Sequence, residues 1–177
     1  MKINDFLTRM WNDYSDLNPH INKVLDLIKE KESKTIINDH IALRTFNHKK
    51  INRHVLSSYF VKNGYKPIED LTFTEKKLKA TYYLHSDPTL PRIFISELLL
   101  ENFSEKLQKS INNKIDEIDV NSISDPEFLT SGIPWSPIDY KTYKEIQSES
   151  DYASWVLAMG YIANHFTVSV TDCSFFK

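Results

Sequence analysis

The chain opens with an amphipathic helical pattern. Between Ile3 and about Lys31, apolar residues recur at intervals of three and four positions, which places them on one face of a helix. Asn18 and Pro19 interrupt this pattern, and both suit the start of a helix, Asn as an N-cap and Pro in the first turn. We therefore predict two helices that meet near Leu17 and pack their aromatic side chains against a sheet.

The next stretch alternates strand and helix patterns. Residues 38–46 look strand-like, whereas residues 47–63 return to helical spacing before Gly64 ends the helix. Three β-rich runs follow, separated by charged or Pro-containing turns, at 68–74, 78–84 and 92–98. The order β, α, β, β, β resembles the repeating module of the vicinal oxygen chelate fold, in which two modules pair their sheets around a metal. We therefore predict an α+β protein of this kind with flanking helices.

The second half of the chain is predicted to be largely helical before a last strand. We expect a helix at 104–118, an irregular Pro-containing stretch, a helical segment from Tyr140 to Gly160 and a strand at 163–170. The sequence ends at Lys177, so we expect the second module to be incomplete. The predicted single domain, 1–177, has four parts: N-terminal helices (1–35), the first module (36–100), a helical insertion (101–161) and the first strand of a second module (162–177).

Two strands share an unusual start, in which a short polar residue precedes a histidine. Asp39 precedes His40 in the first of these strands, and Asn164 precedes His165 in the last. Because strand side chains alternate, His40 and Arg44 share one face, while the apolar residues between them face a core. A lone histidine in an apolar run is more often a buried structural residue. The repeated pattern favours two neighbouring strands whose imidazoles together bind a metal.

Composition narrows the classes of function. The 22 Lys and Arg residues nearly balance the 24 Asp and Glu residues, so we expect neither a nucleic-acid partner nor a membrane partner. A hydrophobic content of 41% supports a folded globule. Cys173 is the only cysteine of the sequence, which excludes an internal disulfide and any zinc motif built on cysteine pairs. With no signal peptide or long apolar span, we expect a cytoplasmic protein.

Four long segments carry a family resemblance: NDHIALRTF, KKLKATYYLH, LPRIFISELL and DYASWVLAMGYIANHFTVSV. They resemble the 2-oxoadipate dioxygenase/decarboxylases, also called hydroxyglutarate synthases, over about residues 38–170. The resemblance implies a vicinal oxygen chelate-like fold and a divalent iron held by two His and one Glu, with His40 and His165 matching the two His. It also implies that Arg44 holds a carboxylate of a 2-oxo acid. The family's Glu lies on a strand well beyond the second His and has no counterpart in this sequence.

The chemistry of such a site can also be derived from the residues. A 2-oxo acid chelates a metal through its keto oxygen and carboxylate, and a ferrous ion with open positions accepts both this chelate and dioxygen. Arg44 lies about 13 Å of backbone rise beyond His40, which suits the remote carboxylate of a six-carbon dicarboxylic acid. We nominate Glu97, near the end of the 92–98 strand, as a third metal ligand. A salt bridge at the strand end is the alternative for Glu97.

We therefore expect an Fe(II)-dependent dioxygenase/decarboxylase that converts a 2-oxo dicarboxylic acid such as 2-oxoadipate to 2-hydroxyglutarate. Another divalent metal is the alternative to iron. A non-catalytic metal- or ligand-binding protein and a glyoxalase-like lyase or isomerase are the alternatives to this reaction. The unpaired edge of the His165 strand and an uncovered apolar face predict a homodimer through the incomplete barrel, with weak or absent dioxygenase activity.

Overall fold

The computed structural model describes residues 1–31, 37–170 and 173. Its elements run in the order α1 (Ile3–Leu17), α2 (His20–Lys31), β1 (Asn38–Phe46), α3 (Arg53–Lys62), β2 (Lys66–Phe73), β3 (Leu78–Leu84), β4 (Arg92–Leu98), η1 (Leu100–Asn102), α4 (Glu105–Asp116), α5 (Val120–Ile123), η2 (Pro126–Thr130), α6 (Tyr140–Glu149), α7 (Asp151–Met159) and β5 (His165–Val168). The predictions for residues 32–36, 171–172 and 174–177 lie outside the described residues.

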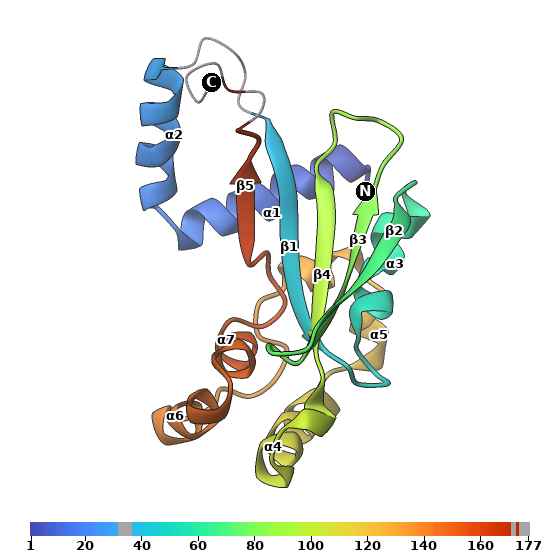
Figure 1. Cartoon of the computed structure of the whole chain (residues 1–177), viewed down its shortest axis with the longest axis vertical. Coiled ribbons are helices and arrows are strands. Elements are labelled where there is room, and N and C mark those ends of the chain that lie inside the picture. The colour runs from blue at the N-terminus through green and yellow to red at the C-terminus, as the bar shows by residue number, and fades with distance from the viewer. Residues whose placement is uncertain (32–36, 171–172, 174–177) are drawn as a thin grey trace.

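The strands form one mixed sheet in the order β2-β3-β4-β1-β5 (Figure 1). β1 runs parallel to β4 and antiparallel to β5, whereas β2, β3 and β4 form consecutive antiparallel pairs. The predicted order β, α, β, β, β is confirmed. The strands that carry His40 and His165, β1 and β5, are direct neighbours, as the repeated sequence pattern predicts.

One face of the sheet is buried under α1 and α3. In Figure 1, α1 passes behind the strands. Phe6 of α1 and Phe60 of α3 are fully buried, and their ring centroids lie 5.8 Å apart. Ile41 and Leu43 of β1 belong to the same apolar core. Since side chains alternate along a strand, Ala42 and its neighbours two positions away, His40 and Arg44, point to the opposite face, where the cleft lies.

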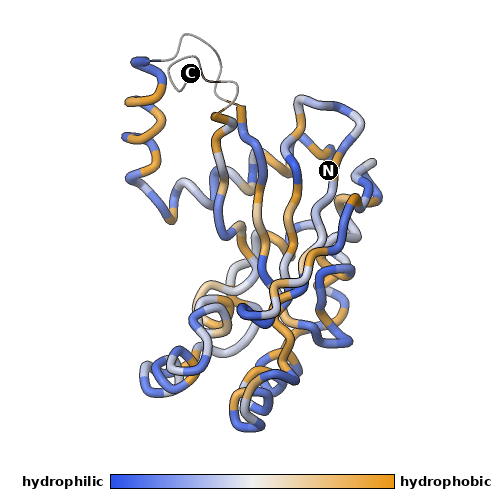
Figure 2. Tube along the Cα trace, viewed as in Figure 1, coloured by the Kyte–Doolittle hydropathy of each residue, from blue (hydrophilic) through white to orange (hydrophobic). Residues whose placement is uncertain are grey.

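The predicted pair of N-terminal helices is confirmed, but only α1 contributes buried side chains. Figure 2 shows apolar and polar residues alternating along α2, and yet none of its residues is buried. Val24 and Leu27 of α2 remain 47% and 63% exposed. No helix within residues 1–31 and 37–170 is both long and apolar enough to cross a membrane.

Helices α4, α6 and α7 lie at one end of the sheet, the lower end in Figure 1. The indole Nε1 of Trp135 donates a hydrogen bond of 3.1 Å to the carbonyl oxygen of Leu157, which ties the preceding loop to α7. Gly160 ends α7 with φ 69°, and a Cβ there would lie 1.9 Å from the carbonyl oxygen of Gly132. The chain therefore needs glycine at this close approach, which directs it into β5.

Two helix boundaries differ from the predictions. The segment 140–160 forms two helices instead of one, because Ser150 is extended and its Oγ accepts a hydrogen bond from the N–H of Ala153 as the N-cap of α7. Helix α3 begins at Arg53 and not near residue 47, because the side chain of Asn52 caps it by accepting from the N–H groups of His54 and Val55. The stretch predicted to be irregular also contains α5 and η2.

Candidate metal and substrate site

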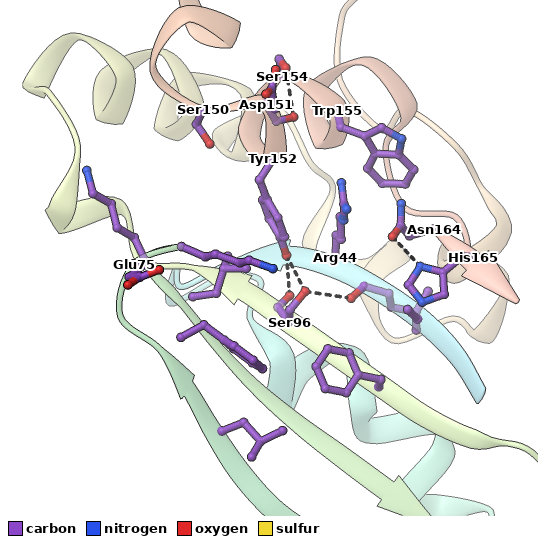
Figure 3. A pocket seen from close by; sticks show the side chains of 18 of the residues that line it. Arg44, Glu75, Ser96, Ser150, Asp151, Tyr152, Ser154, Trp155, Asn164 and His165 are labelled. Atoms are coloured by element: carbon purple, nitrogen blue, oxygen red, sulfur yellow. Dashed lines mark hydrogen bonds between the residues drawn. The ribbon is translucent and has the colours of Figure 1, made fainter. Parts of the chain in front are cut away.

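An open cleft of about 1560 Å³ lies between the polar face of the sheet and α7 (Figure 3). Strands β1, β3 and β4 provide its floor, and residues of α7 form one wall. This volume leaves ample room for a small organic acid. The cleft brings together three of the predicted site residues, His40, Arg44 and His165.

The two histidines meet through their Nε2 atoms, which lie 3.3 Å apart. Their strands bring them there, because His165 of β5 is paired with Ala42 of β1, and His40 lies two residues away on the same face. The two rings are nearly perpendicular, at 79°. The predicted convergence of His40 and His165 is therefore observed, whereas their role as metal ligands stays a prediction.

The residue before each histidine holds the other ring nitrogen. Asp39 Oδ2 lies 2.9 Å from His40 Nδ1, and Asn164 Oδ1 lies 2.9 Å from His165 Nδ1. An oxygen acceptor at each Nδ1 favours the tautomer in which Nδ1 carries the proton. Both Nε2 atoms then present lone pairs to the same point of the cleft. These contacts give a physical reason for the short polar residue before each histidine.

This donor set fits a shared metal ion. Two nitrogens bound to one ion at about 2.1 Å, with an angle of about 100–110° between the bonds, lie about 3.2–3.4 Å apart. Two lone pairs that face each other at 3.3 Å repel unless a cation or a proton lies between them. Burial lowers the pKa of His165, and the nearby His40 and Arg44 lower it further. The neutral imidazole that results is the form that binds a metal.

Arg44 extends into the cleft between two aromatic side chains of α7 (Figure 3). Its Cζ atom lies 4.9 Å from the ring centroid of Tyr152 and 4.9 Å from that of Trp155. Burial lowers the pKa of Arg44, although an arginine keeps its charge at neutral pH. Among residues 1–31 and 37–170, no hydrogen bond or ion pair engages the guanidinium. A partly buried cation without an anionic partner is available for an anionic ligand.

The hydroxyl of Tyr152 is fixed to the sheet beneath Arg44. It donates a hydrogen bond of 2.8 Å to the carbonyl oxygen of Ser96 and accepts one of 3.1 Å from the N–H of Thr45. The Ser96 hydroxyl lies 3.0 Å away. Burial raises the pKa of Tyr152, so the phenol stays protonated and keeps donating. Strands β1 and β4 thereby anchor one wall of the cleft.

The structure does not bring Glu97 to the histidines, which corrects its nomination as a third ligand. Glu97 faces the opposite side of β4, where it is only 4% exposed. Its carboxylate forms an ion pair with the side chain of Arg53 and accepts a hydrogen bond of 3.1 Å from the Arg53 N–H. The alternative, a salt bridge near the strand end, is what forms. Within the described residues, no group of three His, Cys, Asp or Glu side chains could hold a metal.

Sequence reasoning missed Tyr152 and Trp155 as site residues. Both occur in the segment DYASWVLAMGYIANHFTVSV, and their spacing of three residues places them on one face of a helix. That spacing equally fits a helix that packs into a core. Only the tertiary fold shows that this face meets Arg44, because α7 and β1 are far apart in the sequence.

The paired histidine strands and the mixed sheet define an α+β protein with a vicinal oxygen chelate-like fold. A solved protein of the glyoxalase superfamily from Ralstonia eutropha shares this fold, with 17% identity, a TM-score of 0.65, and coverage of 85% of this chain and 56% of that one. At this identity the likeness concerns the fold alone. The family itself follows from closer comparisons.

The chain belongs to the 2-oxoadipate dioxygenase/decarboxylase family, whose sequence profile matches residues 6–131. A relative from rice, named 2-oxoadipate dioxygenase/decarboxylase, is 34% identical over 176 residues, which is 92% of this chain and 48% of the relative. The chain therefore spans about half the length of the curated relatives it matches.

Two solved structures resemble the chain along most of its length. The hydroxyglutarate synthase of Oryza sativa, in complex with 2-oxoadipate, has 32% identity and a TM-score of 0.87, with 93% of this chain and 56% of that chain covered. A protein of Shewanella frigidimarina described as a hydrolase has 44% identity and a TM-score of 0.93, with 99% and 68% covered. The predicted family is therefore confirmed, and the chain's own reaction is a separate question.

Proposed function

We propose that the chain binds a 2-oxo dicarboxylic acid such as 2-oxoadipate beside a divalent iron, and takes part in its oxidative decarboxylation to 2-hydroxyglutarate. One observation carries the proposal: a pair of convergent imidazole nitrogens lines the same cleft as a guanidinium that pairs with no acidic side chain among the described residues. The two imidazole nitrogens suit a metal ion, and the guanidinium suits a carboxylate. The relative's complex with 2-oxoadipate supports the same class of ligand.

In this proposal each residue has a separate task. His40 and His165 hold the iron through Nε2, and Asp39 and Asn164 keep both rings oriented through Nδ1. When bound, iron supplies the coordination of the 2-oxo acid and the activation of dioxygen. Arg44 binds the remote carboxylate with its planar fork, which orients the chain of the substrate along the floor of the cleft.

The reaction balances without a further reductant. One molecule of 2-oxoadipate and one of dioxygen give one 2-hydroxyglutarate and one carbon dioxide. The carboxylate next to the keto group leaves as carbon dioxide. One oxygen atom enters the new carboxylate at the former keto carbon, and the other becomes the hydroxyl on the adjacent carbon. The two electrons that a 2-oxo acid gives up on decarboxylation, and two from the hydroxylated carbon, reduce dioxygen.

The test is the stoichiometry of turnover by the 177-residue chain loaded with Fe(II). The turnover is expected to be weak, and it should consume oxygen and release carbon dioxide in a ratio of one to one, dependent on 2-oxoadipate, with 2-hydroxyglutarate as the product. The double variant His40→Ala, His165→Ala should lose both signals. Substrate conversion without oxygen consumption would contradict the proposal and favour a glyoxalase-like lyase or isomerase.

A second candidate is a metal- or ligand-binding protein without catalysis. One observation favours it: within the described residues the histidine pair lacks a third His, Cys, Asp or Glu side chain. Binding of metal and 2-oxoadipate with no turnover would support this candidate over the dioxygenase. Another divalent metal in place of iron would fit the same binding role.

A further inference from the structure

We infer that Tyr152 and Trp155 are positioning residues, an aromatic clamp that aims the guanidinium of Arg44 at the remote carboxylate of the substrate. The inference rests on the proposed function and goes beyond it, because it assigns the preference for dicarboxylic acids to α7 as well as to Arg44. Figure 3 shows the side chain of Arg44 between the two rings. Each ring centroid lies 4.9 Å from Cζ of Arg44.

The clamp comes from the spacing of two residues on a helix. Tyr152 and Trp155 are three positions apart on α7, so their rings project from the same face. Arg44 projects toward them from β1. Cations prefer the faces of aromatic rings, and an arginine stacks there better than a lysine because its guanidinium is planar. Two rings therefore fix a side chain that otherwise samples many rotamers.

The rings leave the hydrogen-bonding edge of the guanidinium available. Stacking against ring faces covers the flat sides of the group, whereas its N–H donors lie in its plane. A carboxylate that binds at two points approaches in that same plane. Among residues 1–31 and 37–170, no acidic side chain forms an ion pair with Arg44. The clamp thus holds an unpaired fork ready for a carboxylate, which spares the ligand the cost of ordering it.

The two rings differ in how firmly they are held. The Tyr152 hydroxyl has hydrogen bonds to both β1 and β4, so this ring is part of the scaffold. Neither an ion pair nor a hydrogen bond ties the Trp155 side chain to another described residue. Replacing Trp155 therefore tests the clamp with the least damage to the fold. The variant Tyr152→Phe removes the hydroxyl that is hydrogen-bonded to β1 and β4 and keeps the aromatic ring.

The experiment compares two ligands that differ only at the remote end. 2-Oxoadipate carries the remote carboxylate, and 2-oxohexanoate has a methyl group in its place. Both bind the chain loaded with Co(II), without turnover, and calorimetry gives their dissociation constants. We expect Trp155→Leu to raise the dissociation constant of 2-oxoadipate about five- to thirtyfold, the range of a desolvated cation–π contact. The affinities for 2-oxohexanoate and for Co(II) should stay unchanged. Trp155→Phe should restore part of the preference.

Control variants separate a positioning role from a structural one. Tyr140, an aromatic residue at the start of α6, is 76% exposed, so Tyr140→Leu should change neither dissociation constant. Arg44→Ala gives the ratio of the 2-oxoadipate and 2-oxohexanoate dissociation constants when the cation is absent. The clamp would be overturned if Trp155→Leu left the ratio of the two dissociation constants unchanged, whether both ligands bind as in wild type or both bind equally more weakly. If wild type shows no preference for 2-oxoadipate, the proposed function fails at Arg44, and the clamp's role fails with it.

A measurement without ligand tests the clamp independently of the proposed function. Ring currents from two stacked aromatic rings shift the Nε–H proton of Arg44 upfield in the metal-free chain. We expect this shift in the NMR spectrum of wild type and of Tyr140→Leu, and its reduction in Trp155→Leu. An Arg44 signal at an ordinary position in wild type would overturn the clamp even if the chain binds 2-oxoadipate.

Discussion

The two histidines of the cleft are held by partners of different charge. His40 Nδ1 faces the carboxylate of Asp39, which also lies 3.3 Å from the guanidinium of Arg92, whereas His165 Nδ1 faces the neutral amide of Asn164. A carboxylate at Nδ1 makes an imidazole a stronger electron donor at Nε2 than an amide does. The pair is therefore asymmetric, with His40 as the stronger donor to a bound metal.

Replacing Asp39 with Asn should weaken metal binding. The variant keeps an oxygen acceptor for His40 Nδ1 but removes its negative charge, and the loss of such an outer partner typically lowers metal affinity about 10–100-fold. Titration of Co(II) into the wild type and the variant measures the effect. Unchanged affinity would show that orientation alone, and not charge, is what Asp39 supplies. Ser124→Ala, a change of an exposed cap residue, serves as the control.

Replacing Arg44 with Lys should weaken 2-oxoadipate binding with near-normal metal content. Lysine keeps the charge but loses both the two-point fork and the stacking between the rings. We expect a Michaelis constant or dissociation constant about tenfold higher or more, which corresponds to about 1.4 kcal/mol. Metal content by elemental analysis and folding by circular dichroism complete the measurement. Equal loss of metal and fold would instead identify Arg44 as structural.

At the scale of the elements, the strands of the sheet could be predicted from the sequence, whereas the boundaries of the helices beside it could be predicted less well. The strand patterns and turn residues of 38–98 predict the module, because the period of two is enforced by one buried face. The break at Ser150 was not predictable from apolar spacing, which continues through it. The ion pair of Glu97 also could not be predicted from its strand alone, because its partner, Arg53, lies on α3. The histidine pair was predictable, since its sequence pattern occurs twice.

The Arg53–Glu97 pair joins the start of α3 to the end of β4 on the buried face. The two side chains are 12% and 6% exposed, so water screens their interaction little. Among the residues that the structure describes, Glu97→Gln leaves Asp70 as the remaining anionic partner of the partly buried Arg53 guanidinium. We expect a loss of about 3–5 kcal/mol in the free energy of unfolding, measured by urea denaturation, with unchanged Co(II) affinity.

The opposite result for Glu97 would be informative. A Glu97→Gln variant with wild-type stability and strongly reduced Co(II) affinity would contradict its structural role and make it a metal ligand again. Glu105→Gln provides a matched control, because Glu105 lies in the exposed first turn of α4 and should change neither quantity.

At the scale of the whole molecule, the β5 edge and the groove beside it expose apolar surface. In the described part of the chain, β5 pairs with β1 alone. A groove beside this strand is lined by apolar side chains of α1, α2 and β5, including Trp11, Val24 and Phe166. At the other edge of the sheet, β2 carries charged residues, Pro67 and an irregular register, which discourage strand pairing.

We therefore expect the chain to self-associate through the β5 side. Light scattering coupled to size exclusion should show a dimer or larger assembly at micromolar concentration. Val24→Glu places a charge in the groove and should shift the chain toward monomer, whereas Ile68→Glu on exposed β2 should not. A stable monomer of the unmodified chain would contradict this expectation.

The central claim is that His40 and His165 share one metal ion in the cleft where Arg44 binds a carboxylate. A crystal structure of the chain with Co(II) and 2-oxoadipate, grown without oxygen, tests it most directly. We predict one anomalous peak about 2.1 Å from Nε2 of both histidines, with the remote carboxylate of the ligand on the guanidinium of Arg44. The claim would be contradicted by a metal bound elsewhere, or by an empty cleft whose two Nε2 atoms remain in direct contact.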